Sequence, residues 1–422
     1  MADKIRLLQF SDTHFLYSED AGEDDYLQLR ERFKEDLNNM KNERGAVDCI
    51  LICGDIANKG KKEEYDSARK FINSISSVLE VDDQKPNVFV IPGNHDIDRN
   101  IIPYTRQLLC KGLLGQNGDS TFTTLKKEEP IAIEALYSSL SQYNDFAATF
   151  GSVDGVSETI MSGTEDQEPY AKKKVYWVQK IGELSGYNVN LYGLNSTLVC
   201  DGNDAQFPAS GTDKHSVFIP SVAYNILDKD NEINISMVHH PLDWMIGGDK
   251  IETKFDDRFK VQFFGHIHKQ SSRLDNVMRI FSGALQPEEP DDEEYCPVYN
   301  LIELEVKESV LHIELFSRKW DGTTFVKFDS ESKPHDISLK RQNHWAEGKD
   351  EIKEIIPVME KTSVPINEII YMFVKHPKVK NVIKQMNPGS YMDDKPINEN
   401  IVLFLKWVRE NSKFEDLYNL LR

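Results

Sequence analysis

The chain has 422 residues, of which 39% are hydrophobic and 28% charged, and its formal net charge is −20. This composition suits a soluble globular protein of two or three domains and excludes a disordered chain. No run approaches the roughly 18 consecutive apolar residues of a membrane span, which excludes an integral membrane protein. The acidic balance also argues against an extended nucleic-acid footprint, because such footprints neutralise phosphates with clustered Lys and Arg.

The cysteines indicate the redox environment. Their number is odd and they are widely scattered: Cys49, Cys53, Cys110, Cys200 and Cys296. Residues 1–6 lead directly into a strand-like segment without the apolar stretch of a signal peptide. The pattern is typical of reduced thiols and predicts a cytoplasmic protein.

The first hundred residues alternate between strand and helix patterns. Short apolar runs at 5–10, 47–53 and 87–91 each end in a turn, and helical spacing occupies 26–41 and 63–79. Strands that alternate with helices imply right-handed crossovers and a largely parallel sheet. In such sheets ligands bind at the carboxyl ends of the strands.

The rest of the chain divides into less regular pieces. We expect an insertion or cap at about 97–190 that contains a helix at 131–150 and a loop at 151–165. Strands follow at 189–194, 233–238 and 261–264, then an acidic loop at 287–294, closing antiparallel strands at about 297–328 and a polar linker at 329–348. Helical spacing then fills 349–361, 366–386 and 397–421. The sequence therefore predicts a catalytic domain at 1–340 and a small all-α domain at 345–422.

Metal-ligand residue types follow each predicted strand end. They form the stretches Asp12-Thr13-His14, Gly54-Asp55, Gly93-Asn94-His95-Asp96, His239-His240-Pro241 and Gly265-His266-Ile267-His268. In an extended segment, residues two apart project to the same side, so Asp12 with His14, and His266 with His268, can each hold one centre. Carboxylate with imidazole suits Zn, Mn or Fe, whereas calcium prefers oxygen alone. A merely structural cluster would bury these groups without counter-charge, which is costly, so the sequence predicts two divalent metal ions.

These stretches, together with Asn58 and Gly60 after Asp55, resemble the signature of the calcineurin-like metallophosphoesterases. The resemblance implies an α/β fold, a four-layer β-sandwich flanked by helices. It implies one metal on Asp12, His14, Asp55 and His268, and a second on Asp55, Asn94, His239 and His266, with Asp55 bridging. It also implies attack on phosphorus by a metal-bridged hydroxide.

The resemblance also assigns two catalytic residues. His95 would hydrogen-bond the phosphate or protonate the leaving alkoxide, and Asp96 would orient that imidazole. His240 is expected either near the metals without binding them or in a structural role.

Departures from the family pattern narrow the range of expected substrate classes. Asn58 stands where purple acid phosphatases have a tyrosine ligand, and Asn58-Lys59 and Asp96 differ from the protein phosphatases. The pattern looks closer to the cyclic-nucleotide phosphodiesterase and repair-nuclease branches. For the phosphate, Tyr104, Arg106, Lys111 and residues 172–174 are further contact candidates, although a surface role is the simpler interpretation of each.

The C-terminal helices carry no catalytic motif. Their pairing of a Trp-containing helix with a Leu-rich one resembles the death-like effector-associated adaptor domains, which implies a protein partner or self-association. A helical cap or a dimerisation element remains the alternative. Lys375, Lys378, Lys380 and Lys384 could line one basic face, although a solvated face is the simpler interpretation.

The leading hypothesis is therefore a phosphodiesterase for a nucleotide or cyclic nucleotide. Two alternatives stay open: a Mn-dependent DNA or RNA nuclease, and a metal-binding signalling scaffold that acts through residues 345–422.

Overall fold

The computed structural model describes residues 4–16, 26–115, 117–155, 172–201, 217–226, 229–286 and 296–339. In the C-terminal part it describes residues 369, 372–373, 376, 378–387, 389, 391–392 and 397–421. The chain divides into two compact units, Met1–Leu339 and Lys340–Arg422. Among the described helices, none has the length and apolar content that a membrane span requires.

The first sheet is built from both ends of the large unit. Its order is β12-β11-β10-β1-β2-β3, and β13 pairs with β11. The parallel part comprises β1 (Ile5–Phe10), β2 (Cys49–Ile52) and β3 (Asn87–Val90). The antiparallel part comprises β10 (Val298–Lys307), β11 (Val310–Trp320), β12 (Phe325–Lys327) and β13 (Lys333–Ser338).

The second sheet has the order β4-β5-β6-β7-β9-β8. Its strands are β4 (Tyr176–Leu184), β5 (Tyr187–Leu194), β6 (Glu232–Val238), β7 (Val261–Phe264), β8 (Ser271–Leu274) and β9 (Met278–Phe281). The strands β5, β6, β7 and β9 run parallel. Two parallel segments, one in each sheet, therefore supply the strand ends that build the site.

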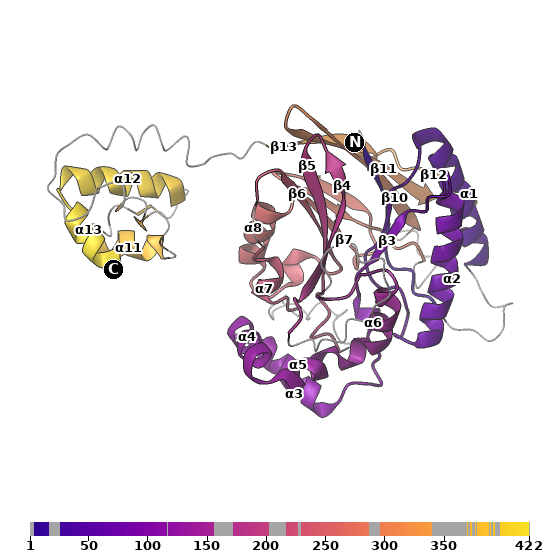
Figure 1. Ribbon diagram of the computed structural model, residues 1–422, viewed down its shortest axis with the longest axis horizontal. Coiled ribbons are helices and arrows are strands. Elements are labelled where there is room, and N and C mark those ends of the chain that lie inside the picture. The colour runs from indigo at the N-terminus through magenta and orange to yellow at the C-terminus, as the bar shows by residue number, and fades with distance from the viewer. Residues whose placement is uncertain are drawn as a thin grey trace. The chain divides into compact units, whose positions relative to one another are not determined.

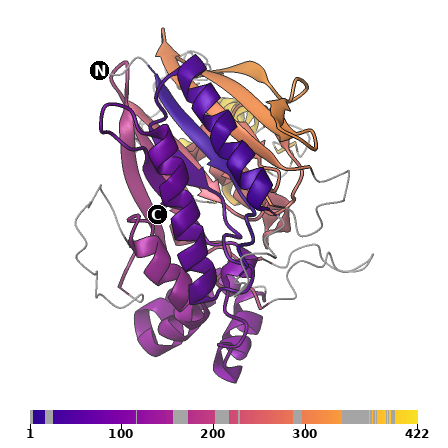
Figure 2. The ribbon, with the colours of Figure 1, turned by 90° about the vertical axis from the view of Figure 1, so that its right-hand side faces the viewer.

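Helices cover the two outer faces of this sandwich (Figures 1 and 2). The first sheet carries α1 (Leu27–Arg44) and α2 (Lys62–Leu79), and the second carries α7 (Ser221–Tyr224) and α8 (Gly248–Arg258). The period of two in a strand explains the packing. In β1, Ile5 and Leu7 enter the core between the sheets, while Leu8 and Phe10 enter the core beneath the helices. The four-layer α/β architecture is the one expected.

The expected cap differs in detail from the structure. Residues 97–190 contain α3 (Tyr104–Leu113), α4 (Gly118–Glu128), α5 (Pro130–Tyr137) and α6 (Ser141–Ala148), but then β4 and part of β5, which belong to the second sheet. The single helix expected at 131–150 is broken by a 3₁₀ turn at Ser138–Leu140.

The linker expected at 329–348 was wrong in its first part, because β13 lies within it. Only Ile337 of this strand is buried, so the edge strand has a polar sequence that resembles a linker. The acidic loop 287–294, the helix expected at 349–361 and residues 156–165 of the expected loop lie outside the described residues.

The smaller unit contains α11 (Val379–Met386), α12 (Ile397–Glu410) and α13 (Phe414–Leu421), which pack on one another. Its core is formed by buried apolar side chains, among them Phe373, Ile383, Phe404, Val408 and Leu417. The described part of this unit is therefore helical, as expected.

A buried carboxylate ties the α3–α6 region to the second sheet. Asp154 accepts a hydrogen bond of 2.6 Å from the hydroxyl of Tyr137 on α5 and another from the Asn195 side chain after β5. Burial raises the pKa of Asp154 to about 6. The folded protein therefore holds this proton to a higher pH than the unfolded chain, and the resulting stabilisation is lost as the pH rises through about 6.

Replacing Asp154 by asparagine tests this linkage. Between about pH 4 and pH 7 the free energy of unfolding of the wild type should fall by about 3 kcal/mol relative to Asp154→Asn, because two units of pKa shift correspond to that amount. Urea unfolding at several pH values measures the difference. The exposed Asp329, replaced in the same way, is the control; parallel curves for wild type and Asp154→Asn would contradict the prediction.

Candidate active site

Seven side chains converge where strands of both sheets end. Asp12, Asp55 and Asn94 follow β1, β2 and β3 of the first sheet, whereas His239, His266 and His268 follow β6 and β7 of the second. His14 lies two residues beyond Asp12. Four of these residues are at most 1% exposed: Asp12, Asp55, Asn94 and His239.

One group contains the two carboxylates. Ligand atoms of Asp12, His14, Asp55 and His268 all lie within 4.8 Å of one another. The Nε2 atom of His268 is 3.3 Å from Oδ1 of Asp12 and 3.5 Å from Nε2 of His14. This is the set that the family resemblance implies for the first metal.

The second group is richer in nitrogen. Nε2 of His239 lies 3.2 Å from Oδ2 of Asp55 and 3.2 Å from Oδ1 of Asn94, and Nδ1 of His266 lies 3.0 Å from the same Asn94 oxygen. Nδ1 of His239 donates a hydrogen bond of 2.7 Å to the Cys53 carbonyl, which orients the ring so that Nε2 faces Asp55 and Asn94. Asp55 is thus in reach of both groups.

The donor set fits divalent cations. Two carboxylates, one amide oxygen and four imidazoles face one another in a buried space, and the Nδ1 atom of His14 has no hydrogen-bond partner among the described residues. Oxygen with imidazole ligands suits Mn, Fe or Zn.

The charges in the site are strongly coupled. Burial acts to raise the pKa of Asp55, but the nearby His239 and His95 outweigh it and hold that pKa well below its usual value. Burial likewise acts to lower the pKa of His239, yet the Asp55 carboxylate raises it to about 9. The neighbouring carboxylates favour the protonated form of His239 and also raise the pKa of His268, and cations would compete with those protons for the same nitrogens.

The backbone is left-handed at five of the seven residues. Asp12, His14, Asp55, His266 and His268 have φ between 40° and 70°. For a residue with a Cβ this conformation is uncommon, although Asp, Asn and His adopt it more readily than others, and it clusters at functional sites. The strands therefore do not run on through the site; each turns sharply and presents its side chain to the centre.

Glycines in the motifs allow this close approach. A Cβ on Gly93 would lie 2.1 Å from Oδ1 of Asp55, and one on Gly54 would lie 2.4 Å from Nδ1 of His239. At Gly265 the nearest atom, Oγ of Ser11, would be 2.3 Å away. All three positions exclude a side chain for steric reasons.

His95 and Asp96 occupy different surroundings. The His95 amide donates a 2.7 Å hydrogen bond to Asp55, and its ring Nδ1 lies 3.1 Å from the Asn58 carbonyl. The fully buried Asp96 carboxylate accepts hydrogen bonds from the amides of Ile56, Ala57 and Gly93 and from the Tyr65 hydroxyl. Burial and the charge of Asp55 raise the pKa of Asp96 to about 7. The contact that positions the His95 ring is thus a backbone carbonyl, which residue types alone do not reveal.

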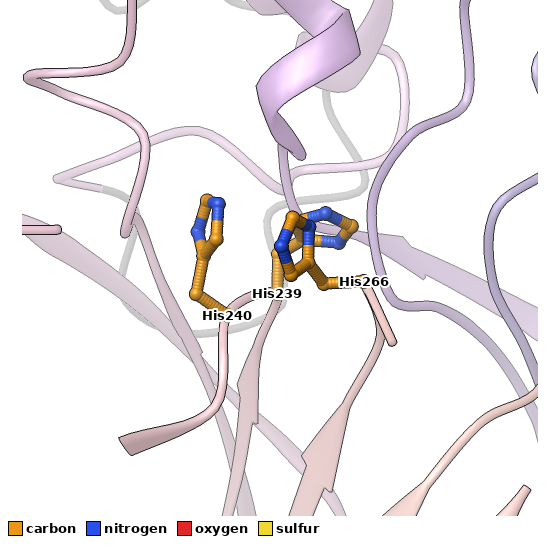
Figure 3. Close-up of side chains that lie close together, drawn as sticks. All are labelled: His239, His240 and His266. Carbon is orange, nitrogen blue, oxygen red and sulfur yellow. The ribbon is translucent and has the colours of Figure 1, made fainter. Parts of the chain in front are cut away.

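His240 lies in the same cluster as His239 and His266 (Figure 3). Its ring centroid is 4.5 Å from that of His266. The ring of Trp244 also packs against His266, with a centroid distance of 4.4 Å. His240 is fully buried, and burial lowers its pKa well below the usual value.

The other phosphate-contact candidates separate into two kinds. Arg106 is fully buried and donates to the carbonyls of Leu136, Leu198 and Cys200, so the interpretation as a surface residue was wrong. Tyr104, Lys111, Lys172 and Lys174 are exposed, whereas Lys173 is buried.

Gln286 is a residue that the motifs missed. Its side chain donates to the carbonyl of Thr13, between Asp12 and His14, and accepts a 2.6 Å hydrogen bond from Arg30. The backbone N–H of Gln286 donates a hydrogen bond of 3.2 Å to the Asp12 carbonyl. It therefore clamps the left-handed turn that presents Asp12 and His14. It lies well beyond the last motif, and a lone glutamine gives no signal in the sequence.

We expect Gln286→Leu to lower metal affinity by about 10- to 100-fold, as is typical when a residue that orients metal ligands is lost. Titration of the metal-free protein with Mn²⁺ measures this. Gln179→Leu is the matched control. Gln179 lies on β4, is as buried as Gln286, and its side chain donates a hydrogen bond to the Gly151 carbonyl. Equal affinities in the two variants would contradict the assigned role.

A family model for the calcineurin-like phosphoesterases matches residues 5–270, and the chain belongs to this family. Over 311 residues it is 25% identical to an uncharacterized metallophosphoesterase-like protein of Bacillus subtilis (strain 168), YydB, in an alignment that covers 70% of this chain and 56% of YydB. The chain thus spans little more than half the length of this curated relative.

The solved structures that match this chain do so with low similarity. Vacuolar protein sorting 29 from Cryptosporidium parvum matches with a TM-score of 0.34 and 10% identity, covering 80% of this chain and 100% of that one. A purple acid phosphatase, PPD1 from yellow lupin (Lupinus luteus) seeds, matches with a TM-score of 0.41 and 12% identity, covering 80% of this chain and 54% of that one. The family-level resemblance found in the sequence is confirmed; its branch and the adaptor-domain resemblance stay predictions.

Proposed function

We propose that the protein hydrolyses a phosphodiester of nucleotide or cyclic-nucleotide type with two divalent metal ions, Mn, Fe or Zn. The observation that carries the proposal is the convergence of seven candidate ligand side chains, among which Asp55 reaches both groups. Asp12, His14, Asp55 and His268 would hold one cation, and Asp55, Asn94, His239 and His266 the other. When bound, such cations lower the pKa of a bound water and offset the charge of the phosphoryl group.

His95 is the proposed proton donor to the leaving oxygen. Its Nδ1 donates to the Asn58 carbonyl at 3.1 Å, so in the imidazolium form Nε2 carries the transferable proton. Its amide bond to Asp55 keeps it beside the reacting centre. Asp96, the residue proposed to orient the His95 imidazole, also accepts hydrogen bonds from the amides at 56, 57 and 93, and thereby holds the turns that carry Asp55 and Asn94.

The charge of the site supports a diester. Among the described residues, the charged groups that act most strongly on Asp12 and Asp55 are histidines and these carboxylates themselves. Lysine and arginine, the usual partners of a phosphate dianion, are not among them. A diester carries one negative charge and needs less compensation than a dianionic monoester.

A metal-loaded enzyme assay tests the proposal. With Mn²⁺, Fe²⁺ or Zn²⁺, bis(p-nitrophenyl) phosphate should be hydrolysed faster than p-nitrophenyl phosphate, and a chelator should abolish both reactions. Cyclic nucleotides and single-stranded DNA, assayed alongside, separate a small-nucleotide enzyme from a nuclease. A protein that binds metal but hydrolyses none of these would favour the signalling scaffold instead.

We also propose that residues 345–422 form an interaction domain. The support is that the described helices have an apolar core of their own and expose Lys378, Lys380 and Lys384 on and next to α11. Light scattering of the full chain over a range of concentrations tests self-association. If these lysines take part, replacing all three by Glu should shift the oligomeric state, and identical profiles would contradict their role.

A further inference from the structure

His240 is the one histidine of the site cluster that has no assigned task. It follows His239 directly at the end of β6, where the chain bends before Pro241. Because of this bend, both imidazoles lie in the same buried cluster with His266, which follows β7 (Figure 3). Nitrogen atoms of the three side chains lie within 4.8 Å of one another.

One edge of the His240 ring is anchored. Nδ1 lies 2.8 Å from Oγ of Ser196, a fully buried residue just after β5. The strands β5 and β6 are parallel neighbours with Leu194 opposite Val238, so Ser196 and His240 leave the sheet at the same edge. His239 has the same arrangement, with Nδ1 donating to the Cys53 carbonyl.

The other edge has no partner. Nε2 of His240 is buried and makes no hydrogen bond to any described residue. A buried polar atom left in this way costs about 1–3 kcal/mol. If Nδ1 carries the proton and donates it to Ser196, Nε2 keeps a lone pair, which is the form in which histidine binds metals.

We propose that His240 is an additional nitrogen ligand of the cation held by His239 and His266, and that Ser196 is its positioning residue. This inference rests on the proposed function. It makes the two metal positions more unequal, because one has two carboxylates with two imidazoles, whereas the other would have three imidazoles beside Asn94 and the shared Asp55. The three-imidazole position should prefer Zn²⁺ or Co²⁺, and the carboxylate-rich position should accept Mn²⁺.

Metal binding by the full chain tests the proposal without reference to turnover. Zn²⁺ is titrated into the metal-free protein against a chromophoric chelator, and the visible absorption of Co²⁺ reports the coordination. His240→Gln should weaken one of two zinc sites by about 100-fold or more and change the Co²⁺ spectrum. Ser196→Ala should weaken the same site by about 10- to 100-fold. His312→Gln, at a histidine paired with Asp336 between β11 and β13, is the control and should match the wild type.

The outcomes are distinguishable. Wild-type affinity at both sites in His240→Gln, or a lower affinity with an unchanged Co²⁺ spectrum, would overturn the inference and leave the proposed function intact. If His240→Gln does not fold, Ser196→Ala decides, since it removes one hydroxyl: a loss at one site supports the inference and wild-type binding overturns it. A wild type that takes up Mn²⁺ or Fe²⁺ but neither Zn²⁺ nor Co²⁺ would overturn the inference alone, and one that takes up none of these ions would overturn both proposals.

Discussion

Asp55→Asn is expected to abolish phosphodiester hydrolysis and to lower the metal content of the protein at both positions. The Asp55 carboxylate lies 3.2 Å from His239 and belongs to the group with Asp12, His14 and His268, so one substitution weakens both sites. Asparagine keeps the volume but removes the charge. Cations in such a site contribute several kcal/mol to transition-state stabilisation. The expected loss in kcat/KM is therefore roughly 10³-fold or more.

The matched control for this substitution is Asp48→Asn. Asp48 lies just before the same strand and accepts a hydrogen bond from the Arg6 amide, outside the site. Metal analysis by mass spectrometry and turnover of bis(p-nitrophenyl) phosphate are measured on both variants. Two metals per chain and unchanged turnover in Asp55→Asn would remove the basis of the dinuclear proposal.

His95→Ala is expected to lower hydrolysis by about 10²- to 10⁴-fold while the metal content stays near that of the wild type. The reason is that His95 lies next to the proposed ligands, with a ring centroid 4.6 Å from that of His14, but its ring nitrogen is held by the Asn58 carbonyl. The loss should be larger for a cyclic nucleotide than for a nitrophenyl ester, because an alkoxide needs a proton to leave and a nitrophenolate does not.

His312→Ala, at a partly exposed histidine far along the chain on β11, controls for the loss of an imidazole. A loss of activity in His95→Ala that follows a loss of metal, or that is equal for the two leaving groups, would argue that His95 supports the site structurally and transfers no proton.

The sequence alone predicts much of the sandwich, and the exceptions have physical causes. Runs such as 5–10 and 261–264 are largely buried on both faces and therefore mostly apolar, with Arg6, Gln9 and Gln262 as the polar exceptions. The strand β4 was not predicted because its alternation of buried and exposed residues is interrupted by a register shift between Lys180 and Gly182. The strand β13 was not predicted because an edge strand with one buried residue has the polar composition of a linker.

The site, too, has a part that the sequence predicts and a part that it does not. The residue types predict that the seven proposed ligands follow the carboxyl ends of strands, where ligands bind in parallel sheets. Three of them follow strands of the first sheet and three follow strands of the second, and His14 lies two residues after Asp12. The contacts that hold them were not predictable from residue types. The Asn58 carbonyl that receives His95 is backbone, Asp96 bonds to three amides, and Gln286 comes from a distant segment.

The left-handed turns limit how the site can change over evolution or by design. Five proposed ligands combine a donor group with a backbone conformation that Asp, Asn and His tolerate better than most residues. Exchanges among these three can alter the metal preference at little conformational cost. Glutamate or cysteine at the same positions would supply a ligand atom but strain the turn. Substitutions meant to change the metal preference of this site are therefore best chosen from Asp, Asn and His.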